Sequence, residues 1–165
     1  MINAMIDTEL WVLAKKKPSK EKFKSEEDYK VALNAHKKIA NFFLKEVPIL
    51  RVYMSLHQVV EIFHVLSSRG SKLPLEVSLQ IVNEILENDK IVKVPILQSH
   101  IKKAIEESAK SGIHVWDYLC FLPVAELVSV VYTSDYHFKQ IGDKFNVKIV
   151  NPAELWLESS FNSHK

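Results

Sequence analysis

The residues best suited to chemistry in this chain are four acids, Asp7, Glu61, Asp117 and Asp135. Carboxylates that crowd together repel one another. At about 4 Å and an effective dielectric constant near 20, one pair costs about 4 kcal/mol. A cluster of them therefore needs protons or cations, and oxygen ligands suit Mg²⁺ or Mn²⁺, which commonly sit between carboxylates and a phosphate. If the four acids meet, the chemistry that they favour is metal-assisted cleavage of a phosphodiester bond.

The elements that must position these acids are short strands separated by helices. Five segments are apolar or β-branched runs too short for helices, and helical patterns lie between them. Strands alternating with helices predict right-handed crossovers and a sheet covered on both faces. We therefore expect a three-layer α/β/α domain with a central, mostly parallel five-stranded sheet. The predicted strands are Ile2 to Ile6, Leu50 to Met54, Ile91 to Val94, Val128 to Tyr132 and Val147 to Val150.

The carboxyl edge of this sheet is where the acids should lie, because functional clefts of open α/β sheets form there. Asp7 directly follows the first strand, and the fourth strand leads through Thr133 into Asp135. Glu61 falls about two turns into the helix after the second strand. Asp117 falls early in the helix before the fourth strand. All four acids can reach the same rim.

Each acid also has a plainer interpretation when taken singly. Asp7 and Asp135 are also suited to capping a helix. Glu61 can be a solvated helix residue, and Asp117 can be a first-turn acid favoured by the helix dipole. Their common position at the sheet edge makes the four together more informative than any one of them.

The helices are predicted from apolar spacing and capping residues. Ser25 with Asp28, and Ser55 with Gln58, have the spacing of capping boxes. A third helix starts at Pro74, and its apolar stripe is expected to face the core. The predicted helices run from Ser25 to Glu46, Ser55 to Ser68, Pro74 onward with the stripe Leu75, Leu79, Val82 and Leu86, Gln98 to Ser111, His114 to Leu127, and from Asn151 and Pro152 to beyond Glu154.

Composition fits a single globular domain over residues 1–165, with 47% hydrophobic and 25% charged residues. The net charge of +2 is uneven, because Lys15 to Lys24 carries +5 and the remainder −3. That segment is either a solvated loop or a contact for a polyanion. The single Cys120 gives no internal disulfide, which favours a reducing, cytoplasmic setting. No signal peptide or membrane span is expected.

Several stretches resemble the PIN-domain nucleases, particularly the VapC-type toxins of toxin–antitoxin pairs. They occur in the family's order and cover most of the chain. The stretches are "AMIDTELWVLA", "HKKIANFFL", "YMSLHQVVEIFHVL", "HVWDYLCF", "VVYTSDYHF" and "VKIVNPAEL".

This resemblance implies a metal-dependent endoribonuclease that uses Mg²⁺ or Mn²⁺. Its four metal-binding acids match Asp7, Glu61, Asp117 and Asp135, and the hydroxyl beside them matches Thr133. It also implies an RNA substrate, an inhibitory antitoxin protein and a homodimer.

Three features depart from the family pattern. Glu9 stands where the family often has asparagine or serine, and it is either an extra outer acid or directed away. Pro123 should kink or split the helix that carries Asp117. The lysine-rich segment is longer than in compact toxins, which leaves the antitoxin-binding surface open. Asp143 is expected to belong to a turn at Gly142.

Other chemistries have weaker patterns. Glu61 and His64 form one E-x-x-H pair, but a di-iron bundle needs two. Cys120 is expected to be a core residue. Trp11, Trp116 and Trp156 are expected to pack in the core rather than stack on bases, although apolar residues around Trp11, Phe42 and Phe43 are alternatively an exposed docking face. A non-catalytic PIN-like module that binds RNA or protein, and a DNA-directed nuclease, remain alternatives.

Overall fold

The computed structural model describes residues 1–156 and contains one sheet of five parallel strands in the order β3-β2-β1-β4-β5. The strands are β1 (Ile2–Ile6), β2 (Leu50–Ser55), β3 (Ile91–Val94), β4 (Val130–Tyr132) and β5 (Lys148–Val150). All four neighbouring pairs are parallel. The predicted three-layer α/β/α architecture is confirmed, and the sheet is entirely rather than mostly parallel.

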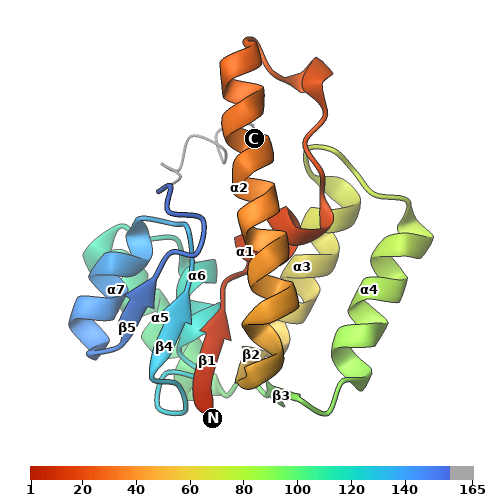
Figure 1. Cartoon of the computed structure of the whole chain (residues 1–165). Coiled ribbons are helices and arrows are strands. Elements are labelled where there is room, and N and C mark those ends of the chain that lie inside the picture. The colour runs from red at the N-terminus through yellow and green to blue at the C-terminus, as the bar shows by residue number, and fades with distance from the viewer. Residues whose placement is uncertain (157–165) are drawn as a thin grey trace.

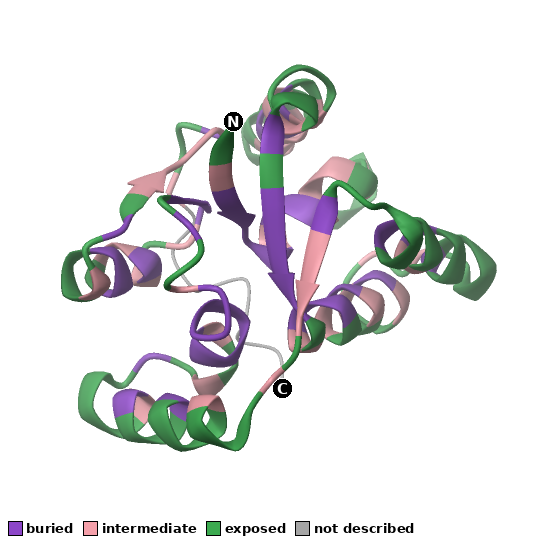
Figure 2. Ribbon diagram, turned by 90° about the horizontal axis from the view of Figure 1, so that it is seen from below, coloured by how far each residue is buried: buried purple, intermediate pink, exposed green. Residues whose placement is uncertain are grey.

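Helices cover both faces of this sheet (Figure 1). One side carries α1 (Thr8–Lys15), α2 (Glu26–Lys45), α3 (Leu56–Ser68) and α4 (Leu75–Glu87), and the other carries α5 (Gln98–Ser111), α6 (Val115–Phe121) and α7 (His137–Phe145). Two short 3₁₀ turns, η1 (Lys20–Lys22) and η2 (Val47–Ile49), complete the described elements. Figure 2 shows the buried central strands and the exposed outer sides of the helices.

Two hydrophobic cores result from the alternation of side chains along each strand. In β1, Ile6 packs into the core beneath α1 to α4, while Met5 packs into the core beneath α5 to α7. In β4, Tyr132 and Val131 divide between the cores in the same way. Because the central strands are largely buried on both faces, apolar residues dominate their sequences, and the polar residues Asn3, Arg51 and Lys93 are exposed or only partly buried.

Capping residues set most helix boundaries close to their predicted positions. The Ser25 and Ser55 hydroxyls accept the backbone N–H groups of Asp28 and Gln58 at 3.0 and 3.2 Å. Gly112 ends α5 in the left-handed region, with φ 74°. The helix that contains Asp117 ends at Phe121, because the chain turns before and after Pro123 instead of continuing to Leu127.

Several expectations from the sequence are wrong. Most of the predicted stripe of α4 faces solvent: Leu75, Leu79 and Leu86 are 59%, 45% and 43% exposed, and only Val82 of the stripe packs against the core. The residues that this helix buries are Ser78, Ile81 and Ile85. Apolar residues lie on more than one side of this helix, so spacing alone does not select the inner side. Trp11 packs in the core as expected, Phe42 is also buried and Phe43 is half-buried, so the alternative of an exposed apolar patch around these residues is wrong.

The C-terminal part also differs from the prediction. Gly142 lies inside α7, which the sequence did not indicate, so Asp143 is a helix residue and not part of a turn. The helix expected after Asn151 begins as a turn, with Glu154 at φ 58°. Its remainder falls outside the described residues.

The position of Gly142 predicts a stability effect. A Cβ at this residue would lie 2.4 Å from Ile149 Cγ1 and 3.0 Å from the Val147 carbonyl oxygen. We expect Gly142→Ala to destabilise the fold by about 1–3 kcal/mol, as overpacking does, measured by urea unfolding. The matched control is Asp143→Ala at the next, exposed position. Equal unfolding midpoints for the two variants would contradict this packing.

Candidate metal centre at the carboxyl edge of the sheet

Asp7 and Thr133 form the centre of the site because β1 and β4 are hydrogen-bonded neighbours. Ile6 pairs with Tyr132, and the Asp7 backbone N–H donates to the Tyr132 carbonyl at 2.8 Å. The next residues of both chains therefore meet: the Thr133 hydroxyl donates to Asp7 Oδ2 at 2.7 Å. Asp7 begins α1 without a side-chain cap hydrogen bond. Its carboxylate is thus directed toward the site and not toward its own helix.

Thr133 also connects Asp7 to Asp135. The same hydroxyl oxygen accepts the Asp135 backbone N–H at 2.9 Å, and Thr133 is fully buried. Asp135 Oδ1 accepts the His137 backbone N–H at 2.8 Å and lies 3.3 Å from His137 Nδ1. One hydroxyl therefore fixes the spacing of two acids.

Glu61 reaches the same edge from the second turn of α3. The Thr8 hydroxyl donates to Glu61 Oε2 at 2.6 Å, and the Cys120 thiol donates to the same oxygen at 3.2 Å. The start of α3 is held to the end of β1, because the buried Gln58 amide donates to the Ile6 carbonyl at 2.6 Å. These contacts position Glu61 from three elements at once.

Asp117 comes from the first turn of α6, which packs against α3 and β2. Ligand atoms of Asp117, Asp135 and His137 lie within 4.8 Å of one another. Glu9, on α1, is held by the Ser134 hydroxyl at 3.0 Å. The glutamate that departs from the family pattern therefore belongs to the acidic cluster and is not directed away from it.

The electrostatics are those of buried, mutually repelling acids. Burial, together with the charges of Asp135, Glu61 and Glu9, raises the pKa of Asp117 to about 8. Burial, with a smaller contribution from Asp135, raises the pKa of Glu9 to about 7, against the opposing Ser134 hydrogen bond. The pKa of Asp7 is raised strongly, first by burial and then by Glu9 and Asp117. A divalent cation would relieve this repulsion, so the donor set fits Mg²⁺ or Mn²⁺.

The structure thus brings together all five residues singled out in the sequence, Asp7, Glu61, Thr133, Asp117 and Asp135. The sequence left Glu9 open, indicated His137 as a surface or partly packed histidine and not a ligand, and did not single out Thr8 or Ser134. The available signal was closeness in sequence: Thr8 directly follows Asp7, Ser134 directly precedes Asp135, and Glu9 lies two residues after Asp7. A second group, His57, Glu61 and Cys120, also has ligand atoms within 4.8 Å of one another. Cys120 is buried, and burial followed by the charge of Glu61 raises the pKa of its thiol, so it is a core residue as predicted.

Comparison with known proteins supports the fold. The chain matches no protein-family model, and no curated protein matches its sequence. Among solved structures, it is similar to the toxin VapC20 of Mycobacterium tuberculosis, described as cleaving the sarcin–ricin loop, with TM-score 0.61 and 13% identity over 84% of this chain and 95% of the toxin.

Two complexes are also similar. VapBC2 of Rickettsia felis, bound to a promoter DNA fragment, gives TM-score 0.57 and 16% identity over 91% of this chain and 98% of the other. VapBC-1 of nontypeable Haemophilus influenzae gives TM-score 0.54 and 17% identity over 92% and 98%.

The raised pKa values predict how stability depends on pH. Between pH 4 and about 8, folded Asp117 holds a proton that the unfolded chain has released, so stability must fall as pH rises through this window. Each such group contributes up to about 1.4 kcal/mol per pH unit. We expect metal-free Asp117→Asn to lose less stability than the wild type between pH 5 and pH 8 in urea unfolding.

The same repulsion predicts that Mg²⁺ or Mn²⁺ stabilises the wild type more at pH 8 than at pH 5. Asp143→Asn, at an exposed acid in α7, provides the control and should retain the wild-type response. Identical pH profiles for the wild type and Asp117→Asn would contradict the clustered arrangement.

The similarity to these three structures extends over most of this chain and nearly all of theirs, and it includes the parallel sheet and its helical layers. This protein therefore has a VapC-like PIN fold.

Proposed function

We propose that this protein is a metal-dependent endoribonuclease and the toxin of a VapBC-type pair. The observation that carries the proposal is the meeting of Asp7, Glu61, Asp117 and Asp135 at the carboxyl edge of a VapC-like sheet, at positions where burial and mutual repulsion favour a bound cation. The name of VapC20 describes RNA cleavage for that protein, which supports the same reaction type here.

Asp7, Glu61, Asp117 and Asp135 would hold Mg²⁺ or Mn²⁺ directly or through water. The ion would supply an activated water and a counter-charge for the phosphate oxygens. Thr133 would position Asp7 and Asp135 through its two hydrogen bonds, and Thr8 would position Glu61. Glu9 would add negative charge at the margin of the cluster.

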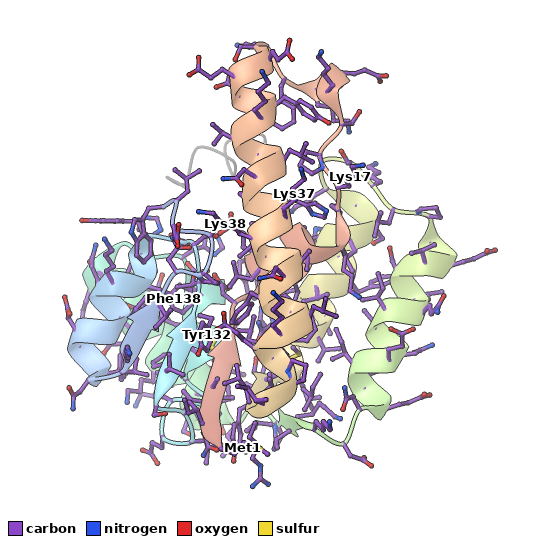
Figure 3. All side chains as sticks on the ribbon, viewed as in Figure 1. Met1, Lys17, Lys37, Lys38, Tyr132 and Phe138 are labelled. Carbon is purple, nitrogen blue, oxygen red and sulfur yellow. The ribbon has the colours of Figure 1, made fainter. Side chains whose placement is uncertain are left out.

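Exposed lysines beyond the carboxyl ends of the strands would contact RNA phosphates. Residues 16–25 and the first turns of α2 project beyond the carboxyl ends of the strands (Figure 1), and Figure 3 labels Lys17 and Lys37 in this part of the molecule. Both lysines are exposed. Lys16 is already used structurally, because its ammonium group donates to the carbonyls of Val65 and Arg69 at 2.5 and 2.8 Å.

An apolar groove supports an antitoxin partner. It has a volume of about 290 Å³ and lies between the α1–α2 pair and α4, with Trp11, Phe43, Ile81 and Ile85 among its lining residues. A groove of this size can accept apolar side chains that a partner helix inserts. Co-expression with the product of a short neighbouring reading frame should give a complex whose nuclease activity is suppressed.

A second copy of the chain is the other proposed partner. Along α5, Leu97, Ile101 and Ile105 are 56%, 45% and 57% exposed at four-residue spacing. A contiguous apolar face of this kind marks an interaction surface. The mass in solution should be that of a dimer, and Ile105→Arg should shift it toward the monomer.

Two features bear on the setting of the protein. No helix within residues 1–156 has the length and apolar character required to cross a bilayer. The buried Cys120 is free. We propose a cytoplasmic location.

The central test is cleavage of a pool of structured and unstructured RNAs with Mn²⁺, Mg²⁺ or EDTA. We expect metal-dependent cuts, and a rate at least about 100-fold lower in Asp135→Asn, the scale of a single group that stabilises transition-state charge. Asp143→Asn should cleave normally. Branched and flapped DNA in the same assay tests the DNA-directed alternative. Absence of metal-dependent turnover in partner-free protein would favour a non-catalytic binding module.

The hydroxyl network predicts graded effects at Thr133. Thr133→Val removes both the donor to Asp7 and the acceptor for the Asp135 backbone N–H. We expect cleavage to fall about 10–100-fold, as when outer partners of metal ligands are removed. Thr133→Ser keeps the hydroxyl and should retain most activity. Equal rates for the valine and serine variants would contradict the positioning role.

A further inference from the structure

An exposed row of aromatic rings lies beside the acidic cluster. The rings of His57 and Trp116 are stacked, with centroids 5.0 Å apart and an interplanar angle of 12°. The His114 ring follows at 6.1 Å and 33° from Trp116. His57 lies one helical turn before Glu61, and Trp116 directly precedes Asp117. The row therefore flanks the site from both α3 and α6.

The position of Trp116 is not explained by core packing. The residue is 46% exposed, whereas Trp11 is 6% exposed within the core. Tryptophan normally buries a large apolar area. The expectation that Trp116 packs in the core is therefore wrong, and an exposed aromatic surface is available at the edge of the proposed catalytic site.

This surface is rigidly held. One side of the Trp116 indole rests on His57, whose Nε2 atom is itself buried. The Trp116 backbone N–H donates to His114 Nδ1 at 3.3 Å, which fixes the start of α6. Behind it, Tyr118 and Phe121 are buried in the core. A ligand that stacks here would cost little conformational entropy of the protein, because the ring is already held in place.

A second exposed aromatic residue serves as a comparison. Tyr136 is 51% exposed, but Lys139 Nζ lies 4.5 Å from the centroid of its ring and 4.1 Å from that of Trp156. The Lys139 ammonium group thus already covers the faces of Tyr136 and Trp156. Within residues 1–156, no lysine or arginine lies over the Trp116 ring in the same way.

We propose that Trp116, backed by His57 and flanked by His114, is a binding site for an unpaired nucleobase of the RNA substrate. The proposal rests on the nuclease function proposed above and specifies its substrate class as RNA with an unpaired nucleotide next to the cleaved phosphate. Bases within a duplex have both faces covered by their neighbours. Only an unpaired or displaced base can stack on a protein ring.

The test measures binding separately from cleavage. A single-stranded RNA of mixed sequence, and the same RNA annealed to its complement, are titrated in EDTA into the wild type, Trp116→Ala and Trp116→Phe. We expect the single strand to quench tryptophan fluorescence in the wild type only. Its Kd should rise about 5- to 100-fold in Trp116→Ala and less in Trp116→Phe, the range for loss of one stacked base.

Two controls assign the effect to stacking. Leu44→Ala, at a 75% exposed position at the end of α2, should bind like the wild type. An abasic nucleotide placed along the single strand should weaken wild-type binding at one position and leave binding by Trp116→Ala unchanged. Affinity for the duplex should be the same in the wild type and both Trp116 variants.

The outcomes separate the two proposals. Metal-dependent cleavage by the wild type, combined with an unchanged Kd and KM in folded Trp116→Ala, would overturn the base-binding site and leave the nuclease intact. Loss of self-association in Trp116→Ala without a change in RNA affinity would also overturn it, because Trp116 would then contact another protein copy. Quenching by RNA with no metal-dependent cleavage under any condition would support the base site while overturning the nuclease.

Discussion

Electrostatic repulsion among buried carboxylates governs the carboxyl edge of this sheet. Burial raises the pKa values of Asp7, Glu9 and Asp117, and neighbouring acids add to the effect: Glu9 and Asp117 act on Asp7, and Asp135 acts on Glu9 and Asp117. Such a cluster opposes folding at neutral pH unless protons or a cation offset its charge. The all-parallel sheet supplies the geometry, because β1 and β4 end side by side and α3 and α6 close over the same edge.

Neutral hydroxyl groups make that geometry specific. Thr133 bridges Asp7 and Asp135, Thr8 holds Glu61, and Ser134 holds Glu9. Each hydroxyl orients a carboxylate without neutralising its negative charge, so the repulsion among the acids still favours a bound cation. The buried Gln58 amide, on the Ile6 carbonyl, joins α3 to β1 and sets the position of Glu61 relative to Asp7. The same hydrogen bonds therefore hold the elements of the fold together and position the acids of the site.

The sequence was sufficient where one physical signal dominated. Strands buried on both faces predicted the sheet, serine caps predicted the starts of α2 and α3, and the carboxyl-edge rule brought Asp7, Glu61, Asp117 and Asp135 together. It was insufficient where tertiary packing decided. α4 has apolar residues on both its inner and outer sides, and α7 contains a glycine that the close approach of Ile149 and the Val147 carbonyl explains. The exposure of Trp116 depends on the placement of α3 beside α6, which no local pattern specifies.

The most direct measurement of the central claim is calorimetric titration of Mn²⁺ into the metal-free protein at pH 7, repeated in buffers of different ionisation enthalpy to count released protons. Asp117, with a pKa of about 8, should give up its proton when the cation binds. We therefore expect binding with net proton release that is smaller in Asp117→Asn. Binding without proton release, or no binding to the wild type, would contradict a metal centre formed by these carboxylates.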